Sequence, residues 1–143
     1  MLSVSVVIPI RNAVRTLPYC LAALQQLDPA PLEILLVDNG SMDGSLSLVR
    51  AFVRDCTDTR IQVLEEPCRG ASTARNTGIR VAQGDVIAFT DADCAPDPSW
   101  LCHLMRPFQD PTVGAVAGCV VAASAASTLE LFSALYTLQL PSR

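Results

Sequence analysis

Short apolar runs alternate along the chain with longer stretches in which apolar residues recur at helical spacing. The runs are rich in β-branched residues and predict strands buried on both faces, over residues 3–10, 32–37, 61–64 and 86–89. The longer stretches predict amphipathic helices, over residues 14–27, 45–54, 71–83 and 98–108. After these, we expect a strand over 113–121 and a last helix over 129–140.

This order of strand, turn and helix, repeated four times, predicts a mostly parallel sheet with helices on both faces. The fold class is therefore α/β, a Rossmann-like three-layer α/β/α sandwich. A length of 143 residues suits a single domain over residues 1–143.

Polar clusters follow three of the predicted strands, at residues 9–12, 38–41 and 91–93. In an open parallel sheet, ligands bind beyond the carboxyl ends of the strands. Because three strands deliver polar side chains or turns to that edge, we expect a nucleotide site there.

Composition narrows the classes of function. The net charge is −4, and the ten basic residues, all Arg, are scattered singly, which disfavours nucleic-acid binding. Six cysteines without a C-x-x-C pair and one histidine offer no zinc cluster. The start of the chain lacks a basic leader pattern, so we expect a cytoplasmic protein with free, mostly buried thiols. The uncharged stretch 111–129 is too rich in small residues to predict a membrane span.

Asp91 and Asp93 flank a small residue at the end of a predicted strand. Side chains at i and i+2 of an extended chain lie on the same side, so both carboxylates can face one ligand. A divalent cation, Mg²⁺ or Mn²⁺, would relieve their repulsion and leave room for phosphate oxygens. The alternative is a structural pair that caps the following helix.

Asp38 and Arg75 are the other candidate binding residues. Asp38 reaches the same edge, where it could accept a hydrogen bond from a base imide or a ribose hydroxyl, or act as a turn former. Arg75 lies one turn into a predicted helix, where a cation beside free backbone N–H groups forms an anion site. Alternatively, Arg75 and Arg69 pair with Glu65 or Glu66. For Asp43 we favour a structural capping role.

Four segments together resemble one family: SVVIPIRNA, EILLVDNGSMDGS, RGASTARNTGI and GDVIAFTDADCAPDPSWL. In order and approximate spacing they are similar to the N-terminal half of family 2 glycosyltransferases of GT-A (nucleotide-diphospho-sugar transferase) fold, over residues 3–104. The resemblance implies an inverting, metal-dependent transferase using Mg²⁺ or Mn²⁺. Its donor would be a nucleotide-diphosphate sugar, most commonly a UDP-sugar, and its acceptor a glycan, a lipid or a small molecule.

The resemblance also assigns roles to residues of this chain. Pro9 and Ile10 would line the base pocket, Asp38 would bind the base or ribose, and Arg75 would face the base or the diphosphate. Asp93 would bind the metal, with Asp91 at the ribose or a metal-bound water. In full, it implies donor binding by Pro9, Ile10, Asp38, Gly70, Arg75 and Asp91, and metal binding by Asp93 and Asp91.

The chain departs from the family pattern after Asp93, the second aspartate of the Asp91–Asp93 pair. The family's general base follows later, but beyond Asp97 the only acidic residues are Asp110 and Glu130, so the catalytic base is not identifiable. We expect a C-terminally incomplete domain in which residues 113–143 begin the acceptor-side half. The alternative is a nucleotide-diphosphate-binding module that cannot turn over.

Two further expectations concern the surroundings of the protein. The apolar tail over residues 113–140 would leave a patch that favours a homodimer, and peripheral association with the cytoplasmic membrane face is compatible with a lipid acceptor.

A phosphotransfer enzyme with a nucleophilic aspartate in the DADC segment is the least favoured of the functions considered. Such folds carry D-x-D after the first strand, whereas here it follows the fourth.

Overall fold

Four strands form one parallel sheet in the order β3-β2-β1-β4. The computed structural model describes residues 2–56, 58 and 60–121. In chain order its elements are β1 (Val4–Ile10), α1 (Leu17–Leu24), β2 (Glu33–Asp38), α2 (Ser45–Asp55), β3 (Ile61–Glu65), α3 (Ala71–Val81), β4 (Val86–Phe89), α4 (Trp100–Met105) and the 3₁₀ turn η1 (Arg106–Gln109). The first four of the five predicted strands and the parallel arrangement are confirmed.

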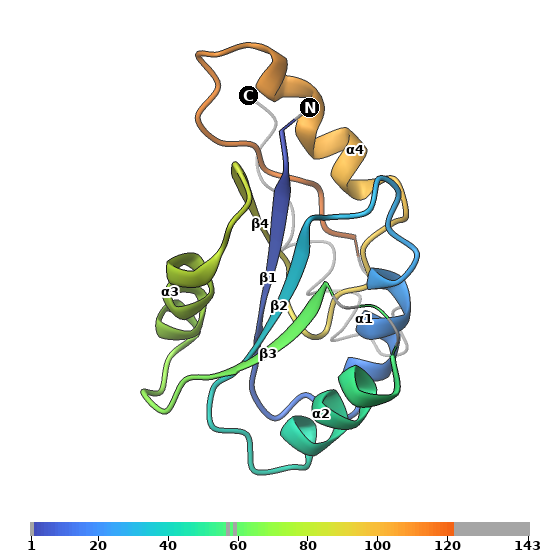
Figure 1. Cartoon of the computed structure of the whole chain (residues 1–143), viewed down its shortest axis with the longest axis vertical. Helices are drawn as coiled ribbons and strands as arrows, with labels where there is room; N and C mark the ends of the chain where they lie inside the picture. The colour runs from blue at the N-terminus through green and yellow to red at the C-terminus, as the bar shows by residue number, and fades with distance from the viewer. Residues whose placement is uncertain (1, 57, 59, 122–143) are drawn as a thin grey trace, which may run out of the picture.

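Alternation along the strands divides the core between the two faces of the sheet. In β1, Val6 and Ile8 pack in the cluster that contains α1 and α2 residues, whereas Val7 packs with Ala74 of α3. Helices α1 and α2 therefore cover one face and α3 the other, as Figure 1 shows. This confirms the three-layer prediction.

Register aligns the carboxyl ends of three strands. Ile10 of β1 pairs with Asp38 of β2, and Asp38 pairs with Glu65 of β3. Strand β4 is aligned with β1 through Val7 and Phe89 and ends shortly before Asp91. The loops that follow these strands consequently start at one edge of the sheet, at the lower end in Figure 1.

A buried polar cluster joins the strands at the opposite, amino edge. The Ser5 hydroxyl donates to Glu33 Oε1 at 2.6 Å and accepts from the backbone N–H of Gly84 at 2.8 Å. Glu33 Oε1 also accepts from the backbone N–H of Gln83 at 2.6 Å. Because Gln83 is held in this way, α3 ends at Val81 rather than at residue 83, where the sequence predicted it.

Helices α1 and α4 are shorter than predicted. Helix α1 begins at Leu17 rather than at 14, because Pro18 has no N–H and fits the first turn of a helix but not its interior. The sequence predicted one helix over residues 98–108, but the structure has α4 followed by the 3₁₀ turn η1. Pro107 supplies no N–H for a continuing α-helix.

The strand predicted over 113–121 is wrong. These residues are described and form no strand, and most of them are exposed. None of them pairs with a strand in the described ranges, so the valines of this segment have no neighbouring strand to pack beside. The helix predicted over 129–140 lies outside the described residues.

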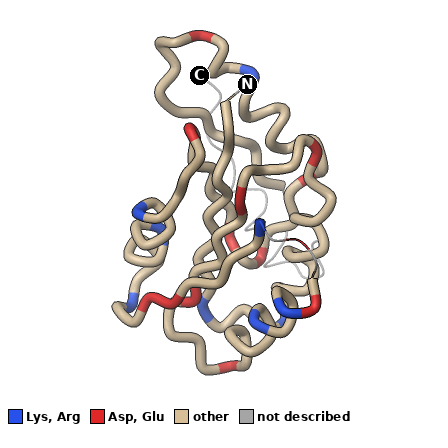
Figure 2. The backbone as a smooth tube through the Cα atoms, in the orientation of Figure 1, with Lys and Arg blue, Asp and Glu red and all other residues tan. Residues whose placement is uncertain are grey.

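The prediction of mostly buried thiols is also wrong. All six cysteines are free, but only Cys20 is buried, and Cys68 and Cys119 are exposed. In Figure 2 the arginine positions are spread over several elements and alternate with acidic positions. None of the helices in the described part of the chain has the length and apolarity needed to cross a membrane.

Helix α3 approaches the sheet closely at Gly78. A Cβ added there would lie 2.4 Å from Val7 Cγ1, and Val7 is fully buried in the middle of β1. Such a separation is far below van der Waals contact, so only glycine allows α3 to pack at this distance.

We therefore expect Gly78→Ala to destabilise the protein by about 1–3 kcal/mol through overpacking, despite the better helix propensity of alanine. Urea unfolding measures the change. Gly114→Ala is the matched control, because the space around Gly114 is open, and it should change stability by no more than about 0.5 kcal/mol. Equal stability of the two variants would contradict the close packing of α3.

Candidate functional site

A pocket of about 390 Å³ lies at the carboxyl edge of the sheet. Its lining comes from the end of β1 and the loop that follows it, the residue after β2, the first residue of α3 and the turn after β4: residues 9–13, Thr16, Asn39, Ala71 and residues 91–93. Its size is in the range of small-ligand sites. The pocket thus lies at the edge where the sequence predicted a ligand.

The β1–α1 loop is fastened to the β2–α2 loop by side chains. Asn12 donates its backbone N–H to Ser41 Oγ at 3.1 Å, and its Oδ1 accepts from the backbone N–H of Met42 at 2.8 Å. The Ala13 N–H donates to Ser45 Oγ at 2.9 Å. These bonds hold one wall of the pocket in place without a ligand.

Asp43 belongs to the same junction. Its Oδ1 accepts from the Ser45 backbone N–H at 3.0 Å and from the Ser45 hydroxyl, and its Oδ2 accepts from the Val14 N–H at 3.0 Å. The hydroxyl of Ser45, followed by the Val14 N–H, lowers the pKa of the Asp43 carboxyl. Asp43 therefore has a structural role, as predicted, but the N-cap position of α2 is held by Gly44.

Asn39 joins the end of β2 to the loop before α3. It is 2% exposed, its Nδ2 donates to the carbonyl oxygens of Glu66 (2.9 Å) and Cys68 (2.7 Å), and its Oδ1 accepts from the Gly70 N–H at 2.7 Å. Its backbone N–H donates to the Ile10 carbonyl at 2.8 Å. One residue therefore connects the ends of β1 and β2 to the start of α3.

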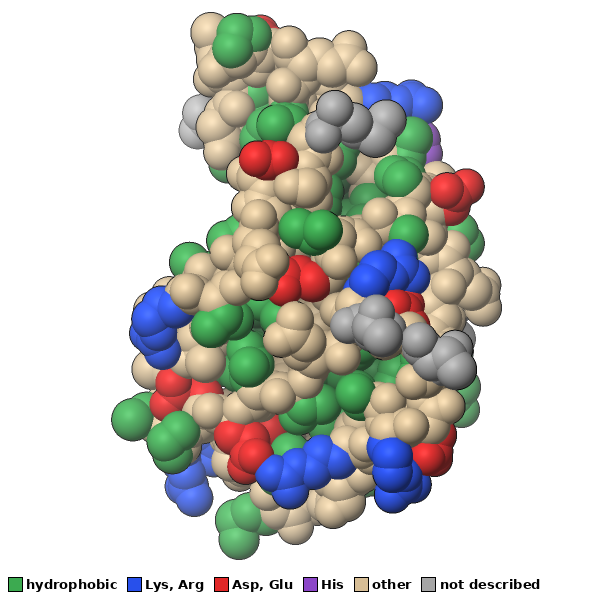
Figure 3. Space-filling view, viewed as in Figure 1, with side chains coloured by type: hydrophobic (Ala, Val, Ile, Leu, Met, Phe, Trp, Pro, Cys, Tyr) green, Lys and Arg blue, Asp and Glu red, His purple; other side chains and the backbone are tan. Residues whose placement is uncertain are grey.

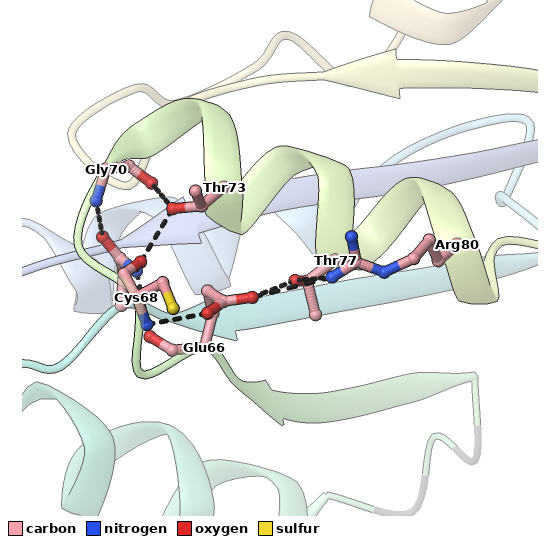
Figure 4. Close-up of polar contacts among 7 residues, drawn as sticks. Glu66, Cys68, Gly70, Thr73, Thr77 and Arg80 are labelled. Carbon is pink, nitrogen blue, oxygen red and sulfur yellow. Dashed lines mark hydrogen bonds and ion pairs between the residues drawn. The ribbon is translucent and has the colours of Figure 1, made fainter.

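A second set of contacts, drawn in Figure 4, orders the loop before α3. Glu66 accepts from the Cys68 N–H at 2.7 Å and from the Thr77 hydroxyl, and Arg80 lies 3.6 Å from the same carboxylate. The Thr77 hydroxyl is the largest cause that lowers the pKa of Glu66. Gly70, at φ +141°, begins the helix in a backbone conformation that favours glycine.

Asp38 is buried beneath this edge rather than lining the pocket. Its Oδ2 accepts from the N–H groups of Gly40 and Ser41, both at 3.1 Å. Its Oδ1 is buried and has no hydrogen-bond partner among the described residues. A buried carboxylate oxygen without a hydrogen-bond partner is costly, so a donor group that reached this atom would relieve that cost.

Arg75 extends from α3 to the turn after β4. Its Nη2 lies 2.6 Å from Asp91 Oδ1 in a partly exposed ion pair. The alternative predicted from the sequence, pairing of Arg75 with Glu65 or Glu66, is wrong: Glu65 pairs with Arg50, and Glu66 is close to Arg80. Figure 3 shows charged side chains of both signs gathered at this lower end of the molecule.

Two thiols contact the Asp91–Asp93 turn. Cys20 Sγ lies 3.7 Å from the Asp91 carbonyl oxygen, and Cys94 Sγ lies 3.7 Å from Asp93 Oδ1. Burial, followed by the nearby Cys94 and the two aspartates, raises the pKa of Cys20 to about 12. Burial is also the main cause that raises the pKa of Cys94. Both thiols therefore stay protonated near neutral pH.

The carboxylates of this turn fit a hard divalent cation that also binds a phosphate. Asp91 and Asp93 both line the pocket. Within the described ranges, no group of three or more His, Cys, Asp or Glu residues could hold a metal by itself. Mg²⁺ usually binds through one or two carboxylates together with substrate phosphates, which this donor set matches.

The predicted site residues divide into two groups. Pro9, Ile10, Asp91 and Asp93 line the pocket, whereas Asp38, Gly70 and Arg75 lie behind it or reach it through another residue. Sequence reasoning did not single out Arg11 and Asn39 as lining residues, although both lie in the polar clusters noted at residues 9–12 and 38–41. The D-N-G-S segment after a buried strand was the available signal for Asn39.

Comparison with known proteins identifies relatives. The sequence profile of Glycosyl transferase family 2 matches residues 5–135. Glycosyltransferase AglE of Haloferax volcanii is 39% identical over 100 residues, which cover 68% of this chain and 33% of that protein.

Solved structures share the fold. The mannosyltransferase PcManGT from Pyrobaculum calidifontis, in complex with GDP-Man and Mn²⁺, is 33% identical with a TM-score of 0.76, over 85% of this chain and 36% of that chain. TarS of S. aureus in complex with UDP-GlcNAc is 21% identical with a TM-score of 0.62, over 75% and 32% of the two chains. The predicted α/β fold is confirmed. The chain spans about a third of the length of these relatives.

Cys20 should resist alkylation in the folded protein. Its thiol is buried and its pKa is raised from 9.0 to about 12, so at pH 8 the nucleophilic thiolate is scarce. We expect iodoacetamide to modify the exposed Cys68 much faster than Cys20, as measured by peptide mass spectrometry. Because the folded-state pKa is the higher one, this group stabilises the fold below about pH 9, and its contribution is lost between pH 9 and 12. Equal labelling of Cys20 and Cys68 would contradict this environment.

Proposed function

Because the chain belongs to glycosyl transferase family 2, we propose that it forms the nucleotide-sugar-binding part of an enzyme that transfers a sugar from a nucleoside diphosphate donor to an acceptor. The main support is the pocket at the carboxyl edge, where Asp93 and the Arg75–Asp91 pair meet. A donor of this kind carries a diphosphate, which needs a cation or guanidinium groups, and a base, which needs hydrogen-bond partners.

Asp93 is the residue we assign to the cation, Mg²⁺ or Mn²⁺. Asp91 is already paired with Arg75, which leaves Asp93 as the carboxylate of the turn without an ion pair among the described residues. PcManGT was solved with Mn²⁺, which supports a divalent cation here. When bound, the cation would offset the negative charge that develops on the departing nucleoside diphosphate.

The diphosphate would lie at the start of α3. Ala71, the first residue of this helix, lines the pocket, and unpaired N–H groups at a helix start attract anions. Arg11 also lines the pocket and forms no ion pair within the described part of the chain. Arg75 can release Asp91 and turn toward the anion, since the pair is partly exposed and therefore weak.

Asp38 would read the base through its unpaired Oδ1. That atom can accept the imide N–H of uracil or the N1–H of guanine, whereas cytosine presents an acceptor at the equivalent ring nitrogen. The neighbours were solved with GDP-Man and with UDP-GlcNAc, and we propose a UDP-sugar or GDP-sugar as the donor.

The catalytic base is the remaining requirement for transfer. Asp91 and Asp93 are the acidic residues of the pocket lining, and Asp110 is engaged with Thr112 in its own turn. We propose inversion at the sugar with a base supplied elsewhere in the enzyme. Among the described residues, the pocket lining has no third carboxylate, which also favours a second function, a module that binds the donor without turnover. Release of UDP or GDP from nucleotide sugars by the purified chain would reject the binding-module function.

We expect Asp93→Asn to abolish most of the Mn²⁺-dependent affinity for UDP or GDP. A loss of at least about tenfold, or about 1.4 kcal/mol, should appear by calorimetry with Mn²⁺, while binding in EDTA stays as in the wild type. The matched control is Asp55→Asn, the same charge change at the exposed C-terminal end of α2. An unchanged effect of Mn²⁺ in Asp93→Asn would overturn the metal assignment.

Asp38→Asn should shift the nucleotide preference of the chain away from UDP and GDP and toward CDP. The amide oxygen can still accept from Gly40 and Ser41, but an N–H₂ group then faces the base instead of an acceptor. We expect UDP and GDP affinity to fall at least about tenfold and CDP affinity to rise relative to them, with stability changed by no more than about 1 kcal/mol. Calorimetry with the three nucleotides and urea unfolding measure these effects. Wild-type preference in the variant would refute the role of Asp38.

A further inference from the structure

Both N–H donors of the Asn39 carboxamide, and one lone pair of its oxygen, are engaged by the protein itself. Both N–H donors of Nδ2 bind carbonyl oxygens of the β3–α3 loop, and Oδ1 accepts from Gly70. The residue lines the pocket, yet neither N–H donor remains for a ligand. Asn39 therefore acts on a donor-poor ligand such as a phosphate mainly through the segments that it holds.

The contacts require an amide of this length. With an aspartate, a charged oxygen without a proton would replace Nδ2, 2.7–2.9 Å from the carbonyl oxygens of Cys68 and Glu66. Like partial charges at that distance repel, and both carbonyls would lose their donor. A serine keeps one hydroxyl but cannot reach all three partners.

The loop held by Asn39 sets the position of α3. Gly70 begins the helix, Ala71 lines the pocket and Arg75, one turn later, reaches Asp91 at 2.6 Å. The strand ends on the other side of the pocket are held by the backbone bond from Asn39 to Ile10. Asn39 thus determines the separation between Ile10 and the first turn of α3.

We propose that Asn39 is a positioning residue of the donor site: its carboxamide holds the start of α3 and Arg75 at the distance from the ends of β1 and β2 that a diphosphate requires. This inference rests on the proposed function, because it assigns the start of α3 to the diphosphate. It predicts that loss of the carboxamide weakens the phosphate contacts more than the base contacts.

The test compares Asn39→Asp with Asn39→Ser and with Ser5→Ala. Ser5→Ala removes a buried hydrogen-bonding side chain at the opposite edge of the sheet and controls for lost stability. For each folded chain, calorimetry with Mn²⁺ gives the dissociation constants of UDP, GDP and the matching monophosphates, well below the unfolding midpoint. Should Asn39→Asp not fold, Asn39→Ser decides the outcome.

We expect Asn39→Asp to bind the diphosphate at least about tenfold more weakly, about 1.4 kcal/mol, and the monophosphate with a smaller loss. Asn39→Ser should be intermediate, and Ser5→Ala should lower the urea midpoint but keep both constants. Equal losses for the two nucleotides, or the same loss in Ser5→Ala, would show a structural role only and overturn the proposal. A wild-type chain that binds neither UDP nor GDP would instead refute the proposed function.

Discussion

The pocket depends on hydrogen bonds that tie separate chain reversals together at one edge of the sheet. Asn39 bonds to the loop before α3 and to the end of β1, and Asn12 bonds to the loop after β2. These bonds are made by side chains and backbone groups of the protein alone. Because the loops are held before any ligand arrives, less entropy has to be lost when a ligand binds.

The charges at this edge are also in place before any ligand arrives. Arg75 neutralises Asp91, Asp93 remains accessible, and Arg11 adds a positive charge to the lining. Two carboxylates and two guanidiniums leave the pocket close to neutral, so a cation and a diphosphate can enter together without a large net charge being buried. Beneath them lies Asp38 Oδ1, which has no hydrogen-bond partner among the described residues and which we propose as the acceptor for a base donor. Together these features suit a ligand with a base at one end and a charged diphosphate at the other.

The sequence predicted the strands well and the helix ends poorly. Strands β1, β2, β3 and β4 were visible because buried parallel strands are continuous apolar runs. The start of α1 was misplaced because Pro18 belongs in the first turn of the helix, whereas a start at residue 14 would put it in the helix interior. The strand expected over 113–121 had an apolar pattern, but a strand also needs a neighbour to pair with, which no local pattern reveals.

The sequence alone predicted the order of elements, the edge that carries the site, and Asp91 and Asp93 as pocket residues. These features follow from local periodicity and the rules of parallel sheets. The pairing of Arg75 with Asp91, the burial of Asp38 and the bridging role of Asn39 were decided by tertiary structure. Each depends on distances between residues 16 to 31 positions apart, or on which lone pair stays unmatched. Packing in three dimensions determines the hydrogen-bond partners of these residues, so the pattern of residues along the sequence does not predict them.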